Sequence, residues 1–307
     1  MKRINYIFII AIILLGACKK DPSEGIQSHE RAIEAVTLGD GLVQVGPAVV
    51  DRANSKVTVR VLMQNGTTFE NVKANIQTSY KSTVKPESGT SIDFAAHDNQ
   101  ATYTVTAETG ETRDWTVELV PFTEPLLGTF NVQSLVVYGG TGPEYGGGGV
   151  IKMTDKPWVW PAVGGPEAEQ DNTLTFVYTG VTPEGNTTGT VTNNAGADGK
   201  YADFKYILNP PTDVNNFYRT IPKGEGTWIH DYNANKVIFK SADGKTTTAT
   251  FVSPGTTTDL GNGKSRTVTD NSFMFTLNGT DDWNNIYSDY DKFVKHPRVY
   301  WIDVKKQ

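Results

Sequence analysis

The chain has 307 residues, of which 37% are hydrophobic, and its formal net charge is −6 at pH 7. This length allows one large domain or two ordinary ones. The acidic balance argues against a nucleic-acid partner, whose phosphates need a basic face. A single cysteine excludes an internal disulfide and a metal site with two cysteine ligands.

The first 17 residues have the order of a secretory signal. Lys2 and Arg3 give a positive start, residues 7–15 are uninterrupted apolar side chains, and Gly16 and Ala17 precede the only cysteine, Cys18. The apolar run is too short for a membrane-spanning helix. We therefore expect residues 1–17 to be removed as a signal peptide.

Residues 15–18, Leu-Gly-Ala-Cys, resemble the lipobox of bacterial lipoproteins. The resemblance implies that Cys18 is acylated and becomes the first mature residue. Two or more acyl chains hold a protein stably on a bilayer where one chain does not. The membrane is then a partner through this lipid anchor.

Residues 18–26 are polar and contain chain-breaking residues, which predicts a flexible tether. The arrangement resembles the surface lipoproteins of Bacteroidetes. That resemblance implies attachment to the outer membrane, with the cell surface favoured over the periplasmic leaflet.

Residues 27–122 show the alternation of a β-sandwich. Residues 57–63 and 101–107 alternate apolar and polar side chains, and a turn at 108–111 leads into 114–119, where Trp115 is large and apolar. This last hairpin resembles the closing hairpin of Ig-like domains common in Bacteroidetes lipoproteins. The resemblance implies an Ig-like spacer.

Pro121 and Pro125 mark a boundary, because proline resists both helix and central strand. Residues 126–307 are again rich in β-strand patterns. Apolar residues at helical spacing over 283–294 predict one helix before a last strand at 299–304. The order resembles a lipocalin-like antiparallel barrel, although Phe130 stands where lipocalins place tryptophan. A jelly roll or second sandwich remains open, and in each case the fold class is all-β.

Aromatic side chains in the second domain are the candidates for ligand binding. Trp158 and Trp160 lie between two prolines, and an extended backbone there would project both indoles to one side. Such indoles suit the C–H faces of sugar rings. The alternative is that both fold back and plug the end of a barrel.

Three further aromatic residues complete the predicted ligand-binding set. Tyr145 belongs to the glycine-rich segment 139–149, which we interpret as a mobile surface loop. Trp283 and Tyr287 lie on the predicted helix. Their spacing is also what a helix needs to dock on a barrel, so core packing is the alternative for this pair.

Motifs for catalysis, metals or cofactors are not apparent in the sequence. The four histidines are scattered, and neither a His-Glu-x-x-His nor a Gly-x-Ser-x-Gly motif occurs. We therefore expect no cofactor and no metal site. Glu167, Glu169 and Asp289 are acids that could pair to cleave a glycosidic bond, which leaves a minor enzymatic alternative.

The sequence predicts a non-catalytic cell-surface lipoprotein that binds a polysaccharide or oligosaccharide through aromatics of its second domain. It resembles the accessory proteins that Bacteroidetes place beside polysaccharide importers, which implies an outer-membrane importer complex as a partner. One alternative is a lipocalin-like carrier of a small apolar ligand, with a hollow barrel. Another is a structural or adhesive surface protein.

Overall fold

The computed structural model describes residues 27–39 and 41–307. The predicted signal peptide 1–17, the tether 18–26 and Cys18 lie outside the described residues. The described residues divide into two compact units, the first made of 27–39, 48–58 and 68–119, the second of 41–47, 59–67 and 120–307. None of the helices in the described part is long and apolar enough to cross a membrane.

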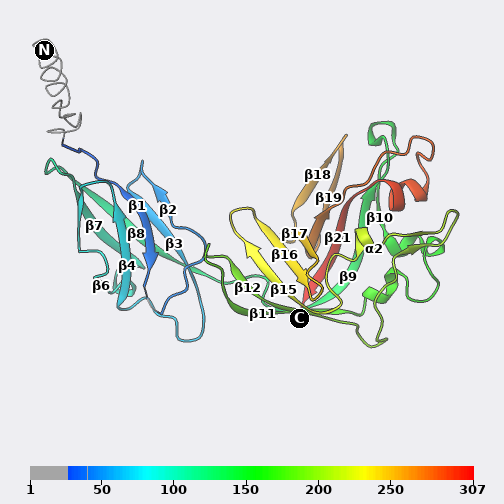
Figure 1. Cartoon of the computed structure of the whole chain (residues 1–307), viewed down its shortest axis with the longest axis horizontal. Coiled ribbons are helices and arrows are strands. Elements are labelled where there is room, and N and C mark those ends of the chain that lie inside the picture. Colours follow the sequence, from blue (N-terminus) through cyan, green and yellow to red (C-terminus); the bar gives the residue numbers. More distant parts are fainter. Residues whose placement is uncertain (1–26, 40) are drawn as a thin grey trace, which may run out of the picture. The chain divides into compact units, whose positions relative to one another are not determined.

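The N-terminal strands form two antiparallel sheets (Figure 1). One sheet has the order β2-β3-β8-β7-β5 and the other has the order β1-β4-β6. The bounds are β1 Ile33–Leu38, β2 Val49–Asp51, β3 Lys56–Leu62, β4 Val72–Thr78, β5 Thr83–Lys85, β6 Ser91–Ile92, β7 Gln100–Thr106 and β8 Thr112–Phe122. A 3₁₀ turn, η2, spans Ala95–His97.

Side chains along these strands alternate between core and solvent, as the pattern predicts, except at the end of residues 57–63, where Leu62 is buried and Met63 is exposed. Val57, Val59 and Val61 are fully buried on β3. In the β7–β8 hairpin, Tyr103 is paired with Trp115, and both are buried. The Trp115 Nε1–H donates to the carbonyl oxygen of residue 31 at 3.0 Å, so its one polar group is satisfied in the core.

The second unit contains a closed antiparallel barrel of eight strands, which confirms the expected all-β class. Consecutive barrel strands are neighbours, and β9 closes the ring by pairing with β21, while β10 adds a ninth strand beside β9. The bounds are β9 Gly128–Gly139, β10 Gly149–Lys152, β11 Thr173–Val181, β12 Thr187–Asn194, β15 Gly224–Asp231, β16 Lys236–Ser241, β17 Thr246–Val252, β20 Asn271–Thr276 and β21 Pro297–Lys306.

Aromatic side chains fill the barrel. Phe176 lies among Phe130, Trp228 and Phe273, with ring centroids 5.6–6.2 Å apart. A cavity between the barrel wall and the segment around Tyr218 has a volume of about 10 Å³, which is room for about one water molecule. A carrier of a small apolar ligand needs a few hundred Å³, so the hollow interior expected for that alternative is not present here.

The remaining elements are short. Strand β13, Lys205–Tyr206, pairs with β14, Thr212–Asp213, and β18, Thr257–Gly261, pairs with β19, Lys264–Thr267. The helical pieces are η3 Pro143–Tyr145, η4 Met153–Asp155, η5 Pro157–Val159, η6 Pro166–Glu169, α2 Asn215–Tyr218 and η7 Asp291–Lys295.

The predicted C-terminal helix is much shorter than its apolar spacing suggests. Residues 283–288 form turns, and η7, a π-helix, follows only near the end of the segment. Tyr287 has φ = +78°, which a right-handed helix does not allow. Trp283 and Tyr287 therefore lie on a loop rather than on a helix docked against the barrel.

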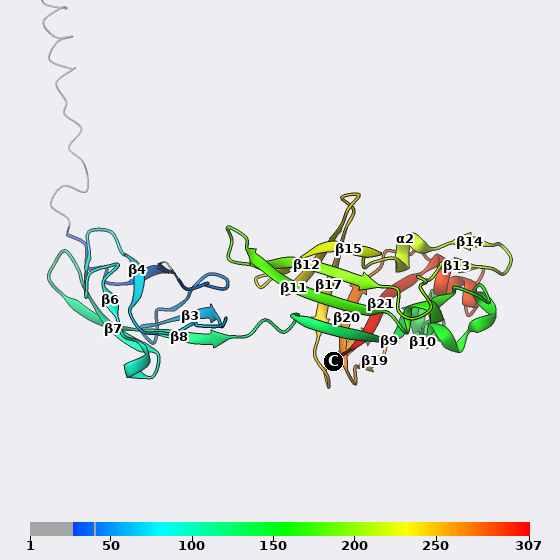
Figure 2. The ribbon, with the colours of Figure 1, turned by 90° about the horizontal axis from the view of Figure 1, so that it is seen from below.

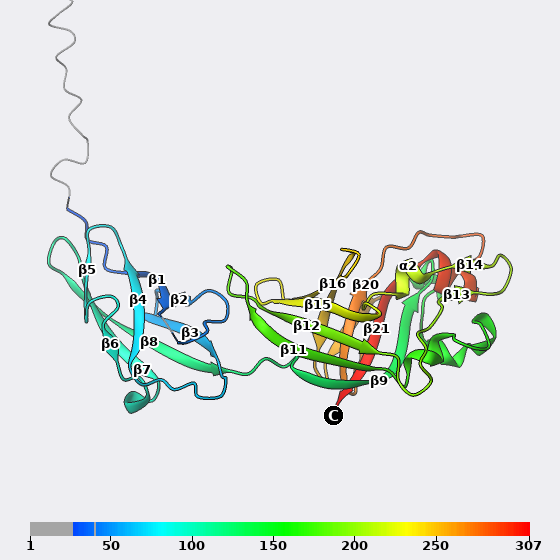
Figure 3. The same cartoon turned by 60° about the horizontal axis from the view of Figure 1, so that its bottom comes forward.

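Long loops gather at one end of the barrel, because successive antiparallel strands alternate in direction. Residues 140–172, 195–223 and 277–296 connect strands at this end, which we call the loop end (Figures 2 and 3). Residues 123–127 enter the barrel at the opposite end, where the turns 182–186 and 232–235 are short and the connection 253–270 contains the β18–β19 hairpin.

Candidate functional site

A buried carboxylate joins two of the loops at the loop end. Asp291 is fully buried and accepts hydrogen bonds from the Thr141 backbone N–H at 2.7 Å and from the Thr141 hydroxyl at 2.8 Å. The same hydroxyl oxygen accepts the N–H of Asp282 at 2.7 Å. These bonds hold the glycine-rich segment 139–149 against residues 281–291, and we call them the Thr141–Asp291 clamp.

Glycines in this segment permit the two loops to touch. Gly142 has φ = +58°, and a Cβ there would lie 3.0 Å from the Trp283 ring. A Cβ on Gly147 would lie 1.8 Å from the Thr141 carbonyl oxygen and 2.9 Å from the Ile286 side chain. The glycine content interpreted as mobility from the sequence therefore serves close packing of backbone against side chains.

Three of the predicted ligand-binding residues come together on these joined loops. Tyr145, Trp283 and Tyr287 are 66%, 54% and 58% exposed. The Tyr145 and Trp283 ring centroids are 6.1 Å apart with an interplanar angle of 64°, and the Tyr287 hydroxyl donates to the Tyr145 carbonyl oxygen at 3.1 Å. We call these three side chains the aromatic platform. Exposed rings fixed by their backbone suit stacking against apolar faces of a ligand.

Trp158 and Trp160 do not project to one side, which corrects the prediction of an extended segment. Trp158 is 56% exposed, whereas Trp160 is 1% exposed. Residues 157–159 form the 3₁₀ turn η5, and three residues per turn separates positions two apart by about 240°. The Trp160 indole contacts Phe293 and Tyr218 with centroids 5.2 and 6.3 Å away, so it belongs to the core and is not available to a ligand.

A charged pair connects the Trp158 segment to the loop that carries Tyr287. The Lys156 amine lies 5.0 Å from the centre of the Trp158 ring and 3.1 Å from a carboxylate oxygen of Asp289. The Lys292 amine donates to the carbonyl oxygen of Tyr287, and burial lowers the pKa of Lys292 from its ordinary value of 10.5. Trp158 is thus an exposed indole tied to the loop of the aromatic platform.

The three acids considered for glycosidic cleavage are each engaged elsewhere. Glu169 is buried, with one carboxylate oxygen 2.7 Å from the Arg219 guanidinium and 2.8 Å from the backbone N–H of residue 202. Glu167 accepts the N–H of residue 165, and Asp289 pairs with Lys156. In the part of the chain that the structure describes, no three His, Cys, Asp or Glu side chains are grouped to hold a metal ion.

A polar cluster at the opposite end was not anticipated from the sequence. Glu124 is 1% exposed and accepts from the Thr187 hydroxyl at 2.5 Å and from the Tyr232 hydroxyl, and its carboxylate lies 3.0 Å from His230 Nδ1. Burial raises the pKa of Glu124, but the neighbouring His230 and the two hydroxyls outweigh it and leave this pKa below the ordinary 4.5. An acid between two prolines looks like an exposed linker residue, so the sequence gives no signal for this contact.

Comparison with known proteins bears mainly on the N-terminal region. Residues 40–119, about a quarter of the chain, match the family model described as SGBP, N-terminal. This region is similar to the N-terminal domains of glycan-binding proteins. The match confirms, for this region, the resemblance to accessory glycan-binding proteins noted in the sequence, and no curated protein matches the chain.

Two solved structures are similar to parts of the chain. A putative secreted protein from Bacteroides fragilis has 16% sequence identity, and the match covers 30% of this chain and 95% of that one with a TM-score of 0.25. A putative glycoside hydrolase from Bacteroides thetaiotaomicron has 14% identity, and that match covers 91% of this chain and 83% of the other with a TM-score of 0.28.

Proposed function

We propose that the chain is a non-catalytic surface lipoprotein that binds glycan through the aromatic platform of its second unit. The observation that carries this proposal is the convergence of Tyr145, Trp283 and Tyr287, all more than half exposed, on two loops held by the Thr141–Asp291 clamp. Because the rings are positioned before a ligand arrives, little conformational entropy is lost on binding.

The position of the platform supports this role. It lies at the loop end of the barrel, whereas residues 123–127 enter at the other end. The family match of the N-terminal region to glycan-binding proteins supports the same ligand class. The domain boundaries 27–122 and 126–307, with the first as a spacer, and an importer complex as partner belong to this proposal.

The lipid anchor is part of the proposal. Acylation at Cys18 would hold the protein at the outer membrane, and the residues that follow would place both units on its cell-surface side. Mass spectrometry of the mature N-terminal peptide tests this part: an acylated Cys18 supports it, and a free thiol on an intact chain contradicts it.

Each platform ring contributes modestly. Covering about 50 Å² of apolar surface on one ring contributes about 1 kcal/mol at about 25 cal/mol per Å², or about fivefold in affinity. Binding should therefore depend on the three rings together. This is the behaviour expected of a surface that holds a long polymer loosely at several points.

The test is retardation in native gels that contain polysaccharide, using the mature protein and a panel of neutral glycans. We expect at least one glycan to retard the protein, and Tyr145→Ala/Trp283→Ala/Tyr287→Ala to abolish the retardation while the melting temperature changes little. Tyr80→Ala is the matched control, because Tyr80 is 78% exposed on the first unit. Equal retardation of the triple variant, or no retardation by any glycan, would contradict the proposal and favour a structural or adhesive role.

A further inference from the structure

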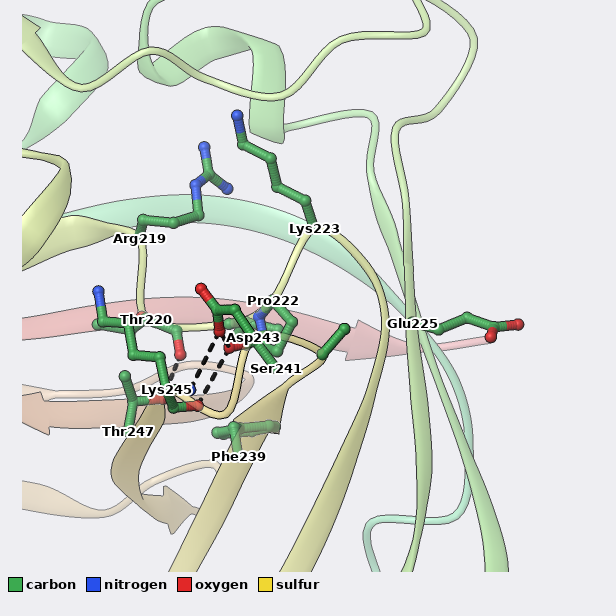
Figure 4. A pocket seen from close by; sticks show the side chains of 12 residues that line it. Arg219, Thr220, Pro222, Lys223, Glu225, Phe239, Ser241, Asp243, Lys245 and Thr247 are labelled. Atoms are coloured by element: carbon green, nitrogen blue, oxygen red, sulfur yellow. Dashed lines mark hydrogen bonds between the residues drawn. The ribbon is translucent and has the colours of Figure 1, made fainter.

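A groove of about 400 Å³ opens at the loop end, separately from the aromatic platform (Figure 4). It lies between residues 219–223, which lead into β15, and the turn 242–245 that joins β16 to β17. Most of its lining surface is apolar, from side chains such as Pro222 and Phe239, and polar and charged groups stand among them. The volume falls in the range of small-ligand sites.

Hydrogen bonds fix the wall of the groove that residues 219–223 form. The Thr247 hydroxyl donates to the carbonyl oxygen of Thr220, which ties residues 219–223 to β17. The Tyr201 hydroxyl donates to the carbonyl oxygen of Asn193 at 2.6 Å and accepts the N–H of residue 224 at 3.0 Å. The groove is therefore a built feature of the fold.

The positive charge of Arg219, at the edge of the groove, is already paired with a buried carboxylate. Arg219 lies 2.7 Å from the buried Glu169 carboxylate, donates to the carbonyl oxygen of Ala202, and has its guanidinium 5.0 Å from the centre of the Phe204 ring. These contacts hold the Arg219 side chain in place. Its charge is matched by Glu169, so it adds little net charge to the groove.

Two lysines give the groove its positive charge. Within residues 27–39 and 41–307, neither Lys223 nor Lys245 forms a salt bridge, and Lys223 rests 5.6 Å from the centre of the Tyr201 ring. Glu225 points away from the other lining side chains in Figure 4. Asp243 is the remaining acid, and one of its oxygens accepts from the Ser241 hydroxyl and from the Lys245 N–H. The lining therefore holds two lysines and one such carboxylate, with Lys223 beside Arg219 and Lys245 interacting with Asp243, in a chain whose overall charge is negative.

The groove also carries an unsatisfied hydroxyl. Thr220 is 6% exposed, and its Oγ1 has no hydrogen-bond partner in the described part of the chain. This oxygen is itself covered by protein atoms, so Thr220 belongs to the packed base of the groove wall rather than to the surface that a ligand would touch.

We propose that this groove binds one carboxylated sugar unit, a uronic acid residue, as a second site that does not depend on the aromatic platform. The sugar carboxylate accepts hydrogen bonds from the Lys223 and Lys245 amines. Its hydroxyls meet Ser241 and Asp243 of the turn between β16 and β17. The site selects for a ligand that has both a negative charge and several hydroxyls.

Calorimetry with trigalacturonate and its methyl ester tests this proposal, because the ester has the same rings without the charge. We expect trigalacturonate to bind with a Kd between about 10 μM and 1 mM, and the ester to bind at least about tenfold more weakly. Lys223→Gln/Lys245→Gln should lose trigalacturonate binding by at least about tenfold. Added salt should weaken binding, because the contact is charged and open to solvent.

Matched variants separate this site from the platform and from general charge effects. Lys264→Gln/Lys305→Gln removes two positive charges from β19 and β21 and should leave binding unchanged. The platform variant Tyr145→Ala/Trp283→Ala/Tyr287→Ala should also keep trigalacturonate binding, so the two proposals can fail independently.

Four results would overturn the assignment. These are no heat at about 10 mM trigalacturonate, equal binding of the ester, equal loss in both lysine pairs, or inorganic phosphate binding as tightly as the trisaccharide. The last of these would make the groove a general anion site.

Discussion

Each end of the barrel contains a buried carboxylate, but the two carboxylates hold different parts of the chain in place. At the end where residues 123–127 enter the barrel, which we call the entry end, the acid Glu124 is buried and surrounded by His230 and two hydroxyls. At the loop end, the acid Asp291 is equally buried, but its bonds to Thr141 hold loops that display three exposed rings. A buried carboxylate fastens the chain at both ends, and at the loop end it also holds the exposed rings of the proposed binding surface.

The largest expected effect on stability comes from replacing the buried tryptophan of the loop end rather than the exposed one. Trp160→Ala should lower the free energy of unfolding by about 3–5 kcal/mol, because it leaves a cavity beside Phe293 and Tyr218. Trp158→Ala should change it by no more than about 0.5 kcal/mol, since that indole is more than half exposed. Urea denaturation measures both, and equal losses would show that the two indoles share one environment.

The stability that Glu124 contributes should decrease in acid. Because the pKa of Glu124 is lowered on folding, its contribution is fully present above the ordinary value of 4.5 and is lost as the pH falls through the folded value. Glu124→Gln should therefore lower the free energy of unfolding by about 1–3 kcal/mol at neutral pH, and this difference should shrink in acid. Denaturation curves at several pH values measure it, and a difference that grows below about pH 4.5 would contradict the sign.

A smaller effect should come from the packing of glycine against the platform. Gly142→Ala should lower the free energy of unfolding by about 1 kcal/mol and displace Trp283, because the added Cβ lies 3.0 Å from the ring. Gly146→Ala is the control: it has φ = +85°, and its Cβ meets nothing within 4 Å. Tryptophan fluorescence and glycan retardation should change in Gly142→Ala alone. Equal changes in Gly146→Ala would show that the positive φ, and not the contact with Trp283, causes the effect.

The strands can be predicted from the sequence because the alternation of apolar and polar side chains is a local pattern. Alternation predicts the buried face of β3 and the Tyr103–Trp115 pair, since side chains in a strand alternate faces whatever lies around them. Closure of the barrel was predicted only through a resemblance, because the pairing of β9 with β21 joins segments more than 150 residues apart in sequence.

The sequence singles out the residues of the proposed platform, but it does not predict how they are arranged. Tyr145, Trp283 and Tyr287 were singled out by type and position, but their meeting depends on the Thr141–Asp291 clamp between distant loops. Trp160 was misplaced because a 3₁₀ turn and an extended segment are both compatible with flanking prolines. In each case a tertiary contact decides among local conformations of similar energy.

The filled barrel has a consequence for how specificity can change. Since Phe176 and its neighbours occupy the interior, the proposed ligand contacts lie on loops that the hydrogen bonds between barrel strands do not require. Exchanging those loops would change the proposed binding surface without removing the hydrogen bonds and packing of the barrel. Affinity and folding stability could then change independently.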